Sequence, residues 1–185
     1  MLIKLTLLLL SFVSLLFGAP SGVYLEAGIA LSDKQTLSSS NASYNFDKAN
    51  ISSFSLGYQD DVYRYEVQER YVAYDLSSAA VGSSNIATTG KLMYDSQLVN
   101  FYYSGYNKSN LVSSVGLGGG ITSIDLKGDI KDKNILTAQG MFSLGYMSGE
   151  HFLTTFKYTY FYIKGSEHFS NDGSNVFTLS LRYIF

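Results

Sequence analysis

The sequence predicts an all-β fold, an eight-stranded antiparallel up-and-down β-barrel with two chemically different faces. Three observations predict it: an aromatic-rich, charge-poor composition, period-two alternation along the chain, and a final alternating segment that ends at Phe185. The 185 residues include 16 Tyr, 12 Phe and 17 Gly, and only 15% are charged, against about 25% in an average globular domain. Such a composition is typical of strands whose two faces meet different surroundings.

The N-terminal segment is predicted to be a secretory signal peptide over residues 1–19. Lys4 precedes an apolar run over residues 5–17, and small residues follow it at 18–22, which is the order expected of such a signal. A membrane-spanning helix is the alternative, but the run is too short to cross about 30 Å of hydrocarbon. Residues 20–185 would then form the mature barrel. With no Cys in the chain, we expect no lipid anchor, disulfide framework or thiolate metal site.

Eight stretches of the mature chain alternate with a period of two residues, which is the strand signature. No other segment approaches the length of a membrane-spanning helix. In the third stretch, for example, Tyr63, Tyr65 and Val67 share one face while Arg64 and Glu66 share the other. The stretches cover residues 22–32, 51–59, 62–74, 91–104, 111–124, 135–147, 151–163 and 175–185.

The connections between these stretches alternate in length. Short ones lie at 60–61, 105–110 and 148–150, and longer polar ones at 32–50, 75–90, 125–134 and 164–174. Outer-membrane barrels have this arrangement, with short periplasmic turns and longer extracellular loops. A soluble lipocalin-like barrel is the alternative, with its apolar face inward. Eight strands enclose a narrow interior, so we expect the many Tyr and Phe rings outside, and Gly, Ser, Thr and paired charges inside.

The last strand carries the most specific pattern. Five hydrophobic residues occupy every second position up to the chain end: Phe177, Leu179, Leu181, Tyr183 and Phe185. This pattern looks like the outer-membrane assembly signal read by the barrel-insertion machinery. It implies a multi-pass protein of the Gram-negative outer membrane, with the assembly machinery and periplasmic chaperones as partners during biogenesis. The alternative is a soluble edge strand that happens to end the chain.

Three segments carry a family resemblance, namely residues 63–67, 115–121 and 177–185. They resemble the corresponding strands of the opacity-protein and OmpA-like eight-stranded barrels, and the order and spacing agree over nearly all of the mature chain. The resemblance implies contact with outer-membrane lipid and lipopolysaccharide. It also implies loops that contact a host or surface ligand, although the loop sequences match no known motif.

Five charged residues have the parity of the barrel interior: Glu26, Arg64, Glu66, Lys157 and Arg182. An unpaired ion in a narrow interior costs several kcal/mol, so we expect these charges to form a paired network. Because the last strand closes against the first, Arg182 is expected to meet Glu26 across that seam. Glu66 is expected to join Lys157 or Arg182 across the lumen. Solvated charges in a water-filled pore are the alternative.

Glu69 differs from these charges because it shares the parity of the lipid-facing Tyr residues. It lies eight residues above the turn at Asp61, so we expect it to reach the outer headgroup zone. A carboxylate there costs little compared with one at the bilayer centre.

The predicted function is a structural or surface-interaction role, adhesin-like, with a filled lumen, no catalysis and no cofactor. A net charge of −2 gives no nucleic-acid footprint. His151 and His168 are too far apart in sequence to suggest a metal site. The Gly116–Gly120 run is not a phosphate loop, because its glycines alternate along a strand.

Two other functions remain as alternatives. The segment 168–171 resembles the His-x-Ser-Asn core of a lipid A deacylase, in which His168 would activate Ser170 as nucleophile. The Glu that should follow a dozen residues later falls near Arg182, and no acidic residue follows Asp172. A porin-like route for small solutes is the third candidate, which a filled lumen disfavours.

Overall fold

The computed structural model describes residues 22–33, 35–38, 42–47, 49–60, 62–81, 84–86, 90–106, 110–126, 130–165 and 170–185. Within these residues the chain forms β-strands and no helix long and apolar enough to cross a membrane. The signal-peptide prediction falls on residues 1–19, outside the described part. The strands are β1 (Val23–Ser32), β2 (Gln35–Ser38), β3 (Ala42–Phe46), β4 (Asn50–Gln59), β5 (Tyr63–Val81), β6 (Ser84–Ile86), β7 (Lys91–Tyr106), β8 (Leu111–Leu126), β9 (Ile130–Ser148), β10 (Phe152–Ile163) and β11 (Asp172–Ile184).

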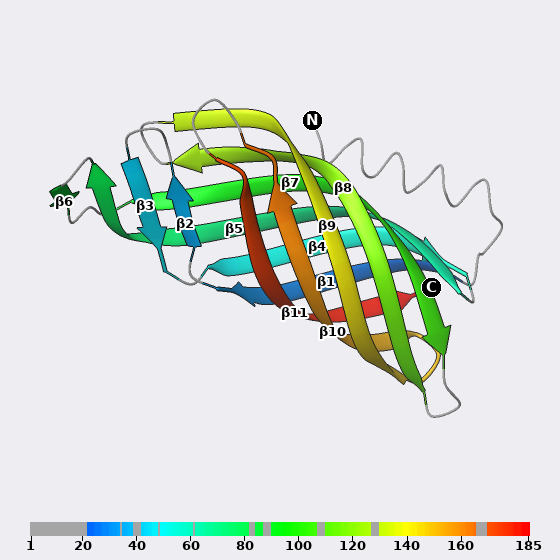
Figure 1. Ribbon diagram of the computed structural model, residues 1–185. Helices are drawn as coiled ribbons and strands as arrows, with labels where there is room; N and C mark the ends of the chain where they lie inside the picture. The colour runs from blue at the N-terminus through cyan, green and yellow to red at the C-terminus, as the bar shows by residue number, and fades with distance from the viewer. Residues whose placement is uncertain are drawn as a thin grey trace.

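Eight of these strands close into an antiparallel barrel (Figure 1). The ring runs β1, β4, β5, β7, β8, β9, β10 and β11, and it closes where β11 pairs with β1. Each barrel strand overlaps one of the eight alternating stretches, so the predicted all-β up-and-down barrel is confirmed. Closure leaves no open edge around the ring, which is what a sheet surrounded by lipid requires.

The two ends of the barrel differ, as the connection lengths predicted. At the short-turn end, β9 and β10 are joined by three turn residues that include Gly149, whose φ of 71° is the left-handed conformation glycine tolerates. The C-terminal residue lies at this same end, where the Phe185 amide donates to the Val23 carbonyl oxygen at 2.9 Å. The opposite, long-loop end carries the longer connections.

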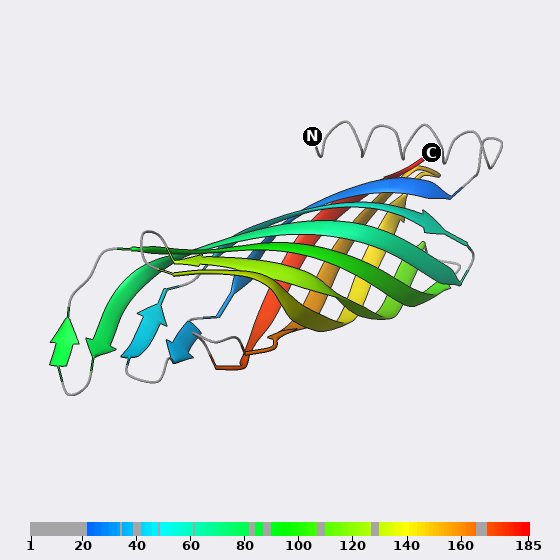
Figure 2. The same ribbon diagram turned by 90° about the horizontal axis from the view of Figure 1, so that it is seen from above.

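All four stretches predicted to be long loops contain strand residues, which corrects the sequence-based boundaries: β8 runs to Leu126, β9 begins at Ile130 and β11 begins at Asp172. β2 and β3 form a hairpin within residues 32–50, and β5 runs on to Val81 instead of ending near Tyr74. Above Asp75, β5 pairs with β3 on one edge and β6 on the other. Figure 2 shows this small sheet, here called the loop platform, standing beyond the barrel. The polar, Ser-rich sequence of these strands has no clear apolar face, so alternation could not reveal them.

The outer wall is apolar and the inner wall is mixed. On each barrel strand, exposed and buried residues alternate with the period of the sheet. Exposed large apolar side chains on the outside include Ile29, Phe54, Val67, Val99, Leu117, Leu136, Phe142, Phe156 and Leu179. This is the face assignment of a membrane barrel and the reverse of a lipocalin-like one.

Candidate functional site in the barrel lumen

An ion pair inside the barrel joins the first and last strands at the seam where the ring closes. β1 and β11 place Glu26 directly opposite Arg182. The Arg182 Nη2 atom donates to Glu26 Oε2 at 2.5 Å, and Nε donates to the same oxygen at 2.9 Å. Arg182 Nη1 reaches on to Gln59 Oε1 at 3.0 Å. Hydrogen-bonded ion pairs of this kind are among the stronger polar contacts in proteins.

Lys157, on the neighbouring strand β10, brings a second positive charge to the Glu26 carboxylate. Its Nζ donates to the other Glu26 oxygen, Oε1, at 2.9 Å, and both side chains are almost fully buried. Glu26 therefore holds two cations, one on each carboxylate oxygen. Its carboxylate is the centre of the pairing expected from the sequence.

Glu66 has different partners from those expected. No ion pair joins it to Lys157 or Arg182 among the described residues. Instead it accepts hydrogen bonds from Tyr24 Oη at 2.7 Å, Asn100 Nδ2 at 2.8 Å and Tyr102 Oη at 2.8 Å. Phenols from β1 and β7 thus satisfy a buried carboxylate of β5, which the alternation pattern alone does not reveal.

Arg64 lies over the ring of Tyr102, with Cζ 3.5 Å from the ring centroid. Its Nε atom is 3.9 Å from Glu66 Oε2, which is an ion pair without a hydrogen bond. A cation stacked on an aromatic face in a dry interior is stabilised by the ring quadrupole. These five residues, Glu26, Arg64, Glu66, Lys157 and Arg182, are called the charged layer below. It fills the lumen nearer the short-turn end.

A ladder of amides continues above the charged layer. Gln139 Nε2 donates to Asn100 Oδ1 at 2.7 Å and to Gln68 Oε1 at 3.2 Å. Gly116 and Gly118 of β8 face this region. A Cβ atom at Gly116 would overlap the Tyr102 ring, and one at Gly118 would overlap Asn100. The glycine run of β8 therefore makes room for large side chains of β7.

Nearer the long-loop end the lumen is filled by apolar and aromatic side chains, here called the apolar cap. This corrects the expectation that Tyr and Phe rings would be confined to the outside. Phe46, from β3 of the loop platform, folds in and lies 6.1 Å from Tyr74, ring centroid to ring centroid. The apolar cap consists of Ala30, Phe46, Ala49, Ile51, Val72, Tyr74, Leu92, Tyr94, Leu98, Ile124, Ile135, Phe161, Ile163 and Val176.

Arg70 lies between the amide ladder and the apolar cap and was absent from the predicted charge set. It is 2% exposed, its Cζ is 4.7 Å from the Phe161 ring centroid, and its Nη1 has no hydrogen-bond partner among the described residues. It has the parity of Arg64 and Glu66 on the same strand, so the signal was present in the alternation. Counting it, the described lumen contains four buried cations and two buried carboxylates, Glu26 and Glu66.

The residues of the predicted assembly signal all lie on the outer wall of β11 and at the chain end. Their side chains are exposed, from 38% at Tyr183 to 55% at Phe185. Tyr183 packs against Phe152 of the neighbouring strand, with ring centroids 5.1 Å apart. The signal and the Glu26–Arg182 seam therefore occupy opposite faces of one strand.

The structure describes only part of the candidate catalytic pair. His168 lies outside the described residues, and Ser170 is exposed. His151 is a turn residue at the short-turn end, where Nδ1 lies 2.8 Å from the Ile184 carbonyl oxygen. Across the described residues, no three His, Asp or Glu side chains are grouped so as to hold a metal ion.

Comparisons with known proteins bear on the fold. No protein-family model and no curated protein sequence matches the chain. Solved structures do match. The chain is similar to Neisserial surface protein A, with 21% identity, coverage of 89% of this chain and 98% of that one, and a TM-score of 0.65. It is also similar to OprG of Pseudomonas aeruginosa, with 15% identity, 89% and 96% coverage and a TM-score of 0.57.

A third similar structure is Ail, the attachment invasion locus protein of Yersinia pestis, solved with the heparin analogue sucrose octasulfate. It has 11% identity, 90% and 100% coverage and a TM-score of 0.50. At these identities the comparisons establish the fold: the chain has the fold of the small eight-stranded outer-membrane barrels.

Proposed function

We propose that this protein is an integral outer-membrane barrel with a sealed lumen, which stabilises the membrane and presents the loop platform for surface interaction. The observation that carries this proposal is the combination of an apolar outer wall with a lumen packed at two levels. The narrow interior of an eight-stranded barrel can be filled by its own side chains. Here the charged layer and the apolar cap provide them.

The surface-interaction part of the proposal rests on the loop platform. β2, β3, β6 and the upper half of β5 extend the sheet past the barrel wall. Phe46 anchors the platform because its side chain is buried in the apolar cap. An anchored platform holds its contact surface in one orientation, which reduces the ordering cost of binding.

Membrane insertion and sealing are tested on protein purified from outer-membrane fractions. A folded barrel is expected to migrate differently before and after boiling on a denaturing gel, and to give no steady conductance in planar bilayers. Identical migration, or recovery in the soluble periplasm, would contradict the membrane assignment. A stable single-channel conductance would contradict the sealed lumen.

The role of the loop platform is tested by replacing residues 35–46 with a short Gly/Ser turn. Binding of whole cells to a host-cell layer is expected to fall while heat-dependent migration persists. Unchanged binding would remove the platform from the proposal.

Lipid A mass spectra with and without the gene are expected to be identical, and an altered acyl pattern would favour the deacylase-like enzyme instead.

A further inference from the structure

The apolar band on the outer wall differs in height around the barrel. On β9, outward residues remain apolar or small from Tyr146 at the short-turn end up to Leu136. At about 3.4 Å per residue and a tilt of about 40°, that span covers about 26 Å along the barrel axis. It matches the apolar band of about 25 Å found in outer-membrane barrels. This side of the wall fits a bilayer of ordinary thickness.

On β4, β5 and β7 the band is much shorter. On β5 the unbroken run of apolar or aromatic outward residues extends only from Tyr63 to Val67, which corresponds to about 10 Å by the same geometry, and Tyr71 follows beyond Glu69. Glu69 follows on β5, and Gln97 and Asp95 follow Val99 on β7, all with exposed side chains. Going from the short-turn end to the long-loop end, the outward residues of β5 and β7 thus become polar at a lower height than those of β9.

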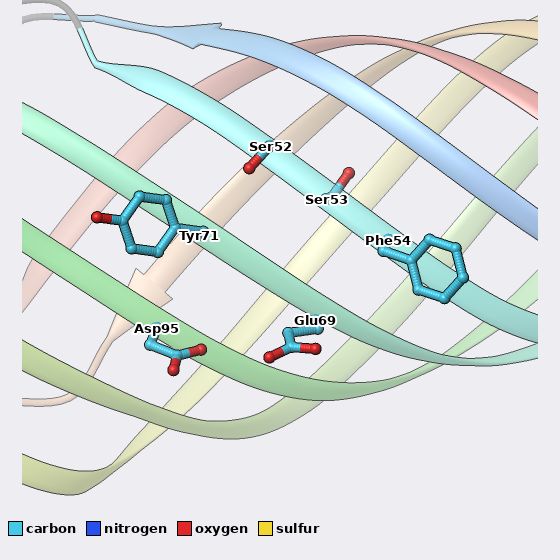
Figure 3. A pocket seen from close by; sticks show the side chains of 6 residues that line it. All are labelled: Ser52, Ser53, Phe54, Glu69, Tyr71 and Asp95. Carbon is cyan, nitrogen blue, oxygen red and sulfur yellow. The ribbon is translucent and has the colours of Figure 1, made fainter. Parts of the chain in front are cut away.

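The polar residues on this side form one continuous surface. Glu69 pairs with Gln97, and Tyr71 pairs with Asp95 in the β5–β7 register, so the two carboxylates are diagonal neighbours on adjacent strands. They border a hollow of about 270 Å³ that is lined by Ser52, Ser53, Phe54, Glu69, Tyr71 and Asp95. Figure 3 shows both carboxylates and the Ser52 hydroxyl on this stretch of wall.

The depth of this polar surface conflicts with a flat bilayer. Glu69 lies six residues past Tyr63, about 15 Å above the start of the apolar band, just past the middle of a hydrocarbon layer of about 25 Å and short of the headgroup zone predicted for it from the sequence. Asp95, eight residues past Tyr103, lies higher, at about 21 Å. The Glu69 carboxylate at that depth would lack both water and an opposite charge. Lys91, on the same face of β7, is instead 3.7 Å from Asp75 near the long-loop end.

We propose that the outer leaflet is thinned against the wall formed by β4, β5 and β7, so that lipid headgroups and their water reach down to Glu69 and Asp95. The membrane itself is the partner of this surface. A shortened apolar band is met by bilayer thinning at a modest cost per ångström. A second copy related by a two-fold axis would bring the same carboxylates face to face, which their repulsion opposes. The proposal rests on the membrane location given under "Proposed function".

The test compares two nitroxide labels in protein reconstituted in phosphatidylcholine vesicles. The chain has no Cys, so Gln97→Cys and Ala138→Cys each give one label site, and both positions face outward. Gln97 is six residues from Tyr103 and Ala138 is eight from Tyr146 along their strands. Through Ile121, Gln97 pairs in register with Leu136, and once the strand tilt is included it lies at nearly the height of Ala138. A flat bilayer is therefore expected to give the two labels similar depths. A thinned leaflet makes the Gln97 label collide more often with a water-soluble nickel chelate than the Ala138 label does.

The outcomes separate this inference from the proposed function. An Ala138 label that is as exposed to the chelate as a label in solution would mean that the barrel is not embedded. An embedded Ala138 label with a Gln97 label at the same depth or deeper overturns the thinning alone. If neither oxygen nor the chelate reaches the Gln97 label, a second copy of the protein covers this wall. That result also overturns the proposed thinning. Adding Glu69→Leu and Asp95→Leu to the Gln97→Cys protein is expected to move that label into the hydrocarbon, and no shift would contradict the proposal.

Discussion

The charged layer and the apolar cap fill the same narrow lumen by opposite means. In the charged layer, each buried carboxylate holds several donors: Glu26 takes Arg182 and Lys157, and Glu66 takes two phenols and an amide. In the apolar cap, side chains pack as in a soluble protein core, with Phe46 contributed from outside the barrel. The charged layer joins barrel strands to one another, whereas the apolar cap joins the barrel to its loop platform.

This difference indicates a division of stabilising roles. Loss of one partner in the charged layer leaves an ion stranded among buried groups, which affects the whole barrel. Loss of a side chain from the apolar cap leaves a void at one end, where the loop platform can separate from the barrel while the strands remain paired.

Glu26→Gln is expected to have the largest effect. It removes the charge that neutralises both Lys157 and Arg182, and breaking a buried ion pair costs about 3–5 kcal/mol. The loss is measured as a change in the free energy of unfolding. The barrel is unfolded with urea in lipid vesicles, and the folded fraction is read from its migration on a gel. The control is the charge swap Glu26→Arg with Arg182→Glu, which should regain part of the stability lost in either single reversal. Absence of any rescue would mean that the seam pairing does not stabilise the barrel.

Phe46→Ala tests the other region. Removing a buried Phe costs about 3–5 kcal/mol where the cavity persists, and here we expect that cost in the docking of the loop platform. Proteolysis of the β2–β3 hairpin in intact cells should accelerate, while urea unfolding of the barrel changes little. Equal losses in both measurements would show that the apolar cap and the barrel unfold as one unit.

Gly116→Ala tests how tightly the charged layer is packed. The added methyl would overlap the Tyr102 ring, which carries Arg64 on its face, and overpacking of this kind costs about 1–3 kcal/mol. Gly119→Ala is the matched control on the same strand, since its nearest neighbour is the Thr137 carbonyl oxygen at 3.4 Å. Similar unfolding free energies for the two variants would show that Tyr102 can move aside without loss.

Much of this arrangement was predictable from parity alone. The eight strands, the outward face of β11 and the inward placement of Glu26 and Arg182 follow from period-two alternation and an even strand count. The apolar cap was missed for a physical reason: in the upper part of β7 both Met93 and Tyr94 are hydrophobic, so the contrast that identifies a face is lost. Phe46 was missed because it lies in a polar stretch that was predicted to be a loop.

The smallest effect is expected at Arg70, which lies where the two regions meet. It has the burial of the charged layer but the surroundings of the apolar cap, since its guanidinium rests on Phe161 and no carboxylate pairs with it among the described residues. A buried ion without a counter-charge is a poor stabiliser, so Arg70→Met is expected to change the unfolding free energy by less than about 1 kcal/mol, or to raise it. Arg182→Met is the matched control, because it removes an equally buried Arg from the partner it holds and should destabilise strongly. A large loss at Arg70 would place it within the charged layer and would move the boundary between the two regions toward the long-loop end.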